Sequence, residues 1–104
     1  MQKELDPSFQ AQGFALAYYA AGMKKEADSA LANYIEQFGK VSAFQIAEIY
    51  AYRNEIDKAF EWLERAYQQR DGGLPEIKGD PLLRNIEKDP RHRAFLQKMK
   101  LPLD

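Results

Sequence analysis

The segment Ser42–Tyr67, SAFQIAEIYAYRNEIDKAFEWLERAY, decides the fold class. Its apolar residues recur at intervals of three and four, the spacing that places side chains on one face of an α-helix. The first stripe consists of Ala43, Ile46, Ala47 and Tyr50, and the second of Ile56, Ala59, Phe60, Leu63, Ala66 and Tyr67. Because only a short turn around Asn54 separates the two stripes, the segment predicts an antiparallel helix hairpin.

The same pattern occurs earlier in the chain at one constant offset, so the chain contains an internal repeat. The matching pairs are Phe14 and Ile46, Ala15 and Ala47, Tyr18 and Tyr50, Ala27 and Ala59, Leu31 and Leu63, and Tyr34 and Ala66. Small residues allow the two helices of a hairpin to approach closely, and large residues fill the groove beside them. We therefore expect two matched hairpins, at residues 8–39 and 40–71.

Local signals mark where the predicted helices begin and end. Pro7 is tolerated in a first helical turn, and Gly22 and Gly39 are natural helix stops. Ser42 followed three residues later by Gln45 matches a capping box, in which each side chain binds the other residue's backbone N–H.

The last third of the chain does not continue the hairpin pattern. Asp71-Gly72-Gly73-Leu74-Pro75 cannot continue a helix, so residues 71–79 are expected to form an ordered extended connection. Asp80-Pro81 and Asp89-Pro90 each start a short helix. Their apolar residues are Leu82, Leu83 and Ile86 in the first, and Ala94, Phe95, Leu96 and Met99 in the second. The sequence predicts one all-α domain over residues 1–104, with residues 72–104 as a divergent C-terminal cap.

The two hairpins resemble the tetratricopeptide repeat family. The residues that carry the resemblance are Ile46-Ala47, Tyr50, Ala59, Leu63 and Ala66, and Phe14-Ala15, Tyr18, Ala27 and Leu31. The family's early Trp position is occupied by Ala11 and Ala43, its last small position in the first hairpin by Tyr34, and its closing Pro by Gly39 and Asp71. The repeat is also about two residues shorter than the family's usual period of about 34 residues. The resemblance covers residues 8–71 and implies a fragment of a right-handed α-solenoid that binds other proteins.

A narrower resemblance covers residues 50–102. The stretch YAYRNEIDKAFEWLERAYQQRDGGLPEIKGDPLLRNIEKDPRHRAFLQKMKLP is similar to the last repeat and tail of bacterial regulators. In such proteins an adenylate cyclase or winged-helix domain lies upstream, and nothing in this chain resembles those domains. The resemblance implies the interaction end of such a regulator, or a stand-alone relative.

The composition excludes several classes of function. The net charge of −1 gives no general attraction to nucleic acid, and without cysteine there is no disulfide, thiol nucleophile or cysteine-based zinc site. With no secretory leader and no apolar run of about 18 residues, we expect no membrane segment in this chain. A cytoplasmic location is expected, and a membrane-anchored parent protein is left open.

Groups able to do chemistry are few. His92, the only histidine, lies between Arg91 and Arg93, where neighbouring cations disfavour its protonation, and we expect it to be exposed or at a rim. Gly72-Gly73 lacks the strand and the Lys-Ser/Thr of a phosphate-binding loop. The carboxylates that would have to hold a metal are expected on solvated helix faces: Glu26, Asp28, Asp57, Glu61 and Glu64. The local excess of basic residues in 84–104 is weak for nucleic-acid binding and could equally pair with an acidic face. We predict no catalytic residue, no metal and no cofactor.

The predicted site follows from the family resemblance. In a tetratricopeptide array the first helix of each hairpin lines a concave surface, on the side opposite the hairpin contact. The positions are Phe9, Gln12, Leu16 and Tyr19 in the first hairpin, and Phe44, Glu48 and Tyr52 in the second. Aromatic rings offer a large contact area with little rotamer entropy to lose, and Gln12 and Glu48 would set the register of a bound peptide. We predict a protein or peptide partner here. The Lys/Asn/Arg set that holds a C-terminal carboxylate in some family members is absent.

Two alternatives remain open from the sequence. The chain's own tail could cover Phe9, Leu16 and Phe44, because its apolar residues must pack somewhere. The function could also be self-association, because solenoids generally need about three repeats and this chain has two. In that case the surplus apolar face of the first helices is buried in a homodimer with no separate ligand.

Overall fold

The computed structural model describes residues 7–71, 74, 77 and 79–99, with side chains described from residue 10 onward. All regular elements within this range are helices, so the predicted all-α class is confirmed. They are α1 (Pro7–Ala20), α2 (Lys24–Phe38), α3 (Ala43–Tyr52), α4 (Ile56–Gln69), the 3₁₀-helix η2 (Pro81–Ile86) and α5 (Pro90–Lys98). Residues Gly72, Gly73 and Pro75 of the expected extended connection lie outside the described residues.

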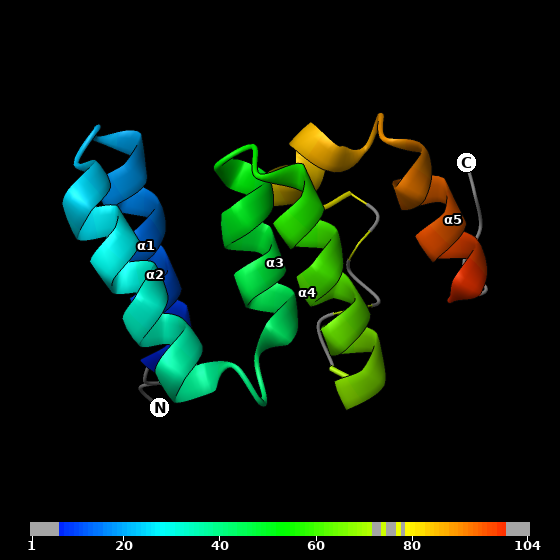
Figure 1. Cartoon of the computed structure of the whole chain (residues 1–104), viewed down its shortest axis with the longest axis horizontal. Coiled ribbons are helices and arrows are strands. Elements are labelled where there is room, and N and C mark those ends of the chain that lie inside the picture. The colour runs from blue at the N-terminus through cyan, green and yellow to red at the C-terminus, as the bar shows by residue number, and fades with distance from the viewer. Residues whose placement is uncertain (1–6, 72–73, 75–76, 78, 100–104) are drawn as a thin grey trace, which may run out of the picture.

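The helices form a flat block of 35 × 35 × 23 Å. In Figure 1, α1 and α2 make one antiparallel pair, and α3 and α4 make a second pair beside it. The 3₁₀-helix η2 packs against α3 and α4, and α5 lies on the side of α4 that faces away from the first hairpin. The order along the chain is therefore also the order across the molecule.

The turns inside the two hairpins are built alike. Gly22 has φ of 80° and Asn54 has φ of 64°, both in the left-handed region that glycine and asparagine tolerate best. In each turn the next residue donates its N–H to a carbonyl five positions back; the pairs are Met23 to Tyr18 and Glu55 to Tyr50, both at 2.9 Å. The offset between these two bonds is the same as the offset between the two apolar stripes.

α3 is the centre of the molecule. It contacts α4 within its own hairpin, α1 and α2 of the first hairpin, and η2 of the tail. A helix covered from several sides must be apolar over most of its surface, and its buried residues are Ala43, Phe44, Ile46, Ala47, Ile49, Tyr50 and Ala51. Ala47 and Ala59 are fully buried, as expected for small residues where two helices approach closely.

The tail completes the core rather than extending into solvent. Leu74, Ile77, Leu83 and Ile86 are all buried in the same cluster as α3 and α4. Each tail helix begins as predicted, because an aspartate accepts a hydrogen bond from the backbone two residues on; the pairs are Asp80 with Leu82 and Asp89 with Arg91, both at 2.9 Å.

Two local predictions were wrong. Phe14, the repeat equivalent of the buried Ile46, is 62% exposed because no described element precedes α1 on that side. Ser42 does occupy the N-cap of α3 but makes no side-chain cap bond, so the capping box does not form. The Gln45 side chain is used elsewhere, since its Oε1 accepts a 2.7 Å hydrogen bond from the hydroxyl of Tyr34.

If the tail is part of the core, Leu83→Ala should lower the free energy of unfolding by about 2–5 kcal/mol, the cost of a cavity at a fully buried leucine. Leu82→Ala is the matched control, because Leu82 is only half-buried and should lose less than half as much. Urea denaturation followed by circular dichroism measures both values. Equal small losses would show that η2 is not part of the cooperative core.

Candidate functional site

α1 and α3 lie side by side and parallel, which brings the predicted site residues of the two hairpins together. The Gln12 amide donates to the backbone carbonyl of Gln45 at 3.2 Å and to Glu48 Oε1 at 2.7 Å. Gln12 is only 7% exposed, so its donor atoms are used in joining the two helices. The prediction that Gln12 sets the register of a bound peptide is therefore wrong, because packing against α3 has already used its amide.

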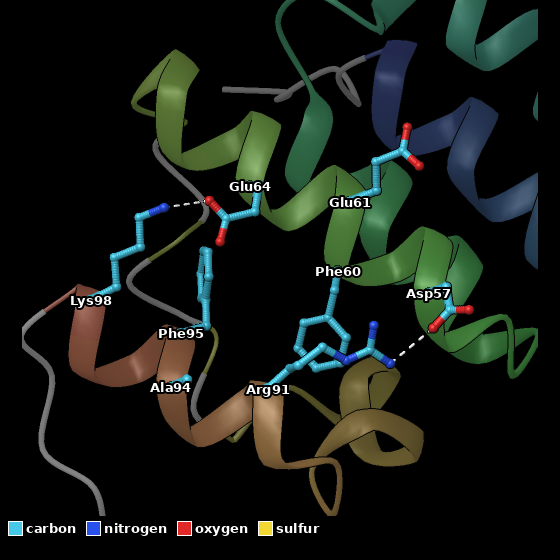
Figure 2. Close-up of a pocket in the computed structure, with 8 residues that line it drawn as sticks. All are labelled: Asp57, Phe60, Glu61, Glu64, Arg91, Ala94, Phe95 and Lys98. Carbon is cyan, nitrogen blue, oxygen red and sulfur yellow. Dashed lines mark hydrogen bonds and ion pairs between the residues drawn. The ribbon is translucent and has the colours of Figure 1, made fainter.

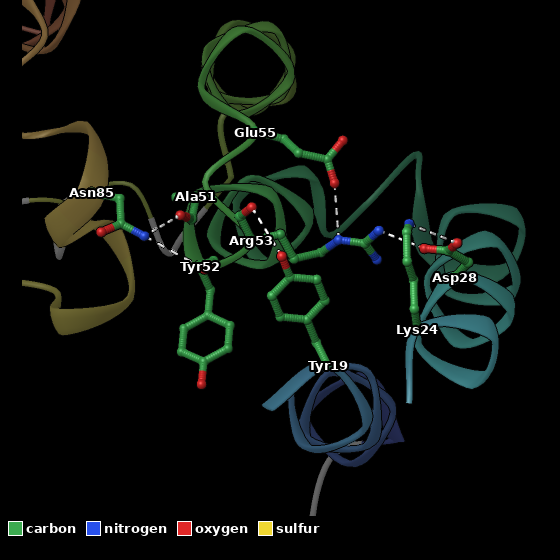
Figure 3. Close-up of polar contacts among 8 residues, drawn as sticks. All are labelled: Tyr19, Lys24, Asp28, Ala51, Tyr52, Arg53, Glu55 and Asn85. Atoms are coloured by element: carbon green, nitrogen blue, oxygen red, sulfur yellow. Dashed lines mark hydrogen bonds and ion pairs between the residues drawn. The ribbon is translucent and has the colours of Figure 1, made fainter. Parts of the chain in front are cut away.

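Tyr19 and Tyr52 form the other end of the contact between α1 and α3. The hydroxyl of Tyr19 donates to the backbone carbonyl of Arg53 at 3.3 Å, and its ring meets that of Tyr52 edge-on with centroids 6.1 Å apart. Tyr52 itself is 37% exposed, and in Figure 3 its ring points into the space between α1 and η2. The contact with Tyr19 thus fixes the ring of Tyr52, and part of this ring remains accessible to solvent.

The remaining predicted residues fall into three situations. Phe44 is only 3% exposed and its backbone N–H is bound by Asp71 at 3.1 Å, so it belongs to the core and offers no binding surface. Leu16 and Glu48 are half-buried. Phe9 lies in α1, and its side chain is outside the described residues. We call the accessible parts of Leu16, Tyr19, Glu48 and Tyr52 the α1–α3 face.

Arg53, which no sequence pattern singled out, joins the two hairpins at this end. Its side chain is buried, binds Asp28 and Glu55, and lies over the ring of Tyr19 at 5.0 Å (Figure 3). Burial alone would lower the pKa of Arg53, but the hydrogen bonds and charges of Asp28 and Glu55 outweigh burial and raise it. The hydrogen bond from Arg53, followed by that from Lys24, lowers the pKa of Asp28. The sequence does offer a signal for this contact. Arg53 directly follows the apolar stripe of the third predicted helix, and the helix before that one carries the acidic Asp28.

His92 is buried, which corrects the prediction that it is exposed or at a rim. Its Nε2 has no hydrogen-bond partner, and burial lowers the pKa of the imidazole below its ordinary value of 6.5, against a smaller opposite effect of Glu87. The histidine is therefore a neutral core residue of α5, out of reach of a substrate in this structure.

A cavity of about 370 Å³ lies between α4 and α5, with Phe60 and Phe95 at its base (Figure 2). Two ion pairs cross from one helix to the other, Asp57 with Arg91 at 2.9 Å and Glu64 with Lys98. The basic residues of the tail thus pair with the acidic outer face of α4. The cavity is where charged side chains hold α5 in place, and among the described residues no cluster of three potential metal ligands occurs.

Comparison of the chain with models of protein families, with curated proteins and with solved structures gives no match. The resemblance to tetratricopeptide repeats therefore stands on the residues that carry it. In the part of the chain that the structure describes, none of the helices has the length and apolar character needed to cross a bilayer.

Arg53→Leu should lower the free energy of unfolding by about 1–3 kcal/mol, because the hydrogen bonds that a charged group makes between the hairpins are lost. Lys24→Leu is the control, since this lysine binds the same Asp28 from a largely exposed position and should change stability far less. Chemical denaturation of the two variants compares them. Equal effects would mean that Arg53 does not join the hairpins.

His92 should make stability fall on mild acidification. Its pKa is lower in the folded chain than in the unfolded chain, so well above pH 6.5 both states are neutral and the stability contribution of His92 is fully present. As the pH falls below 6.5 the unfolded chain takes up the proton first, and stability is lost until the folded pKa is passed. His92→Phe should flatten the pH dependence of unfolding between about pH 7 and 5. An unchanged slope would contradict the buried neutral state.

Proposed function

We propose that the chain is a protein–protein interaction module that binds a peptide or protein segment on the α1–α3 face. The observation that carries the proposal is the ring of Tyr52, which is 37% exposed and rests edge-on against Tyr19. Because the ring is already held before a partner arrives, binding costs it little rotamer freedom. Such a ring is suited to an apolar side chain of the partner.

The surroundings of Tyr52 support a binding surface. Its backbone and that of Ala51 accept hydrogen bonds from the Asn85 amide, at 3.4 and 2.9 Å, so η2 is fixed beside the ring (Figure 3). The half-buried Glu48 lies one helical turn before Tyr52 on the same face of α3, and its hydrogen bond with Gln12 fixes α1 beside the ring. The partner we propose therefore places an apolar residue against Tyr52.

The wider setting is also part of the proposal. The narrower resemblance of residues 50–102 supports a role as the C-terminal tetratricopeptide region of a bacterial regulator, of the adenylate cyclase or winged-helix transcriptional kind, acting in the cytoplasm. The two turns of the same construction, at Gly22 and Asn54, support the repeat on which that resemblance rests. We propose binding without catalysis, and the burial of the only histidine supports it, because a general acid or base must reach its substrate.

Panning a random peptide library against the purified chain tests the proposal. Tyr52→Ala should weaken the selected peptide about tenfold, about 1.4 kcal/mol, because a central aromatic contact is removed. Fluorescence anisotropy of the labelled peptide gives the dissociation constants.

Tyr67→Ala is the matched control, because Tyr67 is 38% exposed but lies on α4 against α5. Equal affinities of the Tyr52 and Tyr67 variants would place binding elsewhere, and failure to select any peptide would contradict the proposal as a whole.

A further inference from the structure

An open hollow of about 460 Å³ lies on the first hairpin, which forms one end of the molecule (Figure 1). The half-buried ring of Tyr18 contributes an aromatic wall from α1, and this ring stacks on Phe14 with centroids 6.4 Å apart. The rest of the lining comes from α2 and consists of Lys25, Glu26, Ser29, Ala30 and Asn33. We call this site the Ala30 hollow, because the small side chain of Ala30 leaves space beside the tyrosine ring.

The internal repeat shows what fills the equivalent place in the second hairpin. Tyr18 and Ala30 correspond to Tyr50 and Trp62, at the same offset as the other repeat pairs. Both Tyr50 and Trp62 are buried, and they belong to the same core cluster. A hairpin of this construction therefore accommodates an indole ring at this position. The first hairpin carries a methyl group there instead, and the space that the indole occupies in the second hairpin is open.

The rim of the Ala30 hollow carries groups that recognise an indole ring rather than any apolar group. In the second hairpin the guanidinium of Arg65 lies over the ring of Trp62, 4.4 Å from its centroid, and tryptophan is the aromatic side chain that attracts cations best. In the first hairpin the exposed Lys25 makes no ion pair with the described residues, so its ammonium group is free to take the same role. The exposed Ser29 and Asn33 offer oxygens that accept a hydrogen bond from an indole N–H.

We propose that the Ala30 hollow binds an exposed tryptophan side chain of a partner protein. The indole ring lies against Tyr18 and the methyl group of Ala30, and the apolar area removed from water drives binding. Lys25 covers the outer face of the ring, and its N–H donates to Ser29 or Asn33. The site shares no residue with the α1–α3 face and does not rest on the proposed function.

An NMR titration of the ¹⁵N-labelled chain with N-acetyltryptophanamide tests the site. Shift changes should centre on the backbone amides of Tyr18, Ala30 and Asn33, with a dissociation constant on the order of millimolar, because a single ring on an open surface makes few contacts. N-acetylleucinamide is the matched ligand, since it is apolar but has neither a π face nor an N–H on its side chain. It should bind about fivefold more weakly. Equal shifts from the two ligands would contradict recognition of an indole ring, and shifts confined to other residues would place binding elsewhere.

Ala30→Trp should abolish the binding of N-acetyltryptophanamide, because the chain's own indole then fills the hollow as Trp62 does in the second hairpin. Ala32→Trp is the matched control, since Ala32 is exposed on the same helix and does not line the hollow. This variant should bind like the wild type, and circular dichroism checks that both variants are folded. Binding by Ala30→Trp as strong as that by Ala32→Trp would overturn the proposal.

A second pair of variants leaves the shape of the hollow intact. Lys25→Ala should weaken binding about two- to fivefold, the effect of losing a cation over an exposed ring. Lys24→Ala is its control, because Lys24 pairs with Asp28 and does not line the hollow. Equal affinities of these two variants would contradict a lysine over the ring. Tyr52→Ala should leave the titration unchanged, so a failure of this proposal leaves the peptide proposal standing.

Discussion

The burial of α3 is the constraint on which the rest of the structure depends. Most of this helix is apolar and buried, so it gains stability only when elements cover it from several sides, while Glu48 and Tyr52 stay partly accessible. Its hairpin partner α4 covers one side, the first hairpin covers a second, and η2 covers a third. A single hairpin cannot supply this, which explains why two hairpins and a tail form one unit.

The same constraint reshapes the binding site. A residue on α1 that faces α3 is drawn into the packing between the hairpins, so Gln12 ends in a hydrogen bond with Glu48 and its donor atoms are spent. Phe44, at the start of α3, is covered as well. Tyr52 stays partly accessible because it is the last residue of α3, where its ring extends into the space between α1 and η2. The accessible surface is therefore smaller than the full set of residues that the repeat register indicates.

Charged residues form ion pairs where separate parts of the fold pack against each other. Arg53 links the second hairpin to Asp28 of the first, and Arg91 and Lys98 link α5 to acidic residues of α4. Exposed ion pairs contribute little to stability one by one. Their positions matter more than their strength, because each pair sits where two helices meet and selects one relative placement of these helices.

Sequence alone determined the helical class, the two hairpins related by the internal repeat and the aspartate-proline starts of both tail helices. These features depend on contacts between residues close together in the chain, which periodicity and capping chemistry report directly.

The tertiary structure decided which side of each stripe is covered. Phe14 and Ile46 have the same place in the repeat, yet Phe14 is exposed and Ile46 is buried, because the first hairpin packs against α3 and none of the described elements covers Phe14. His92 likewise is buried although its flanking arginines are exposed, and Gln45 binds Tyr34 instead of capping its own helix. Burial and long-range hydrogen bonds depend on elements far away in the chain, and no local pattern carries that information.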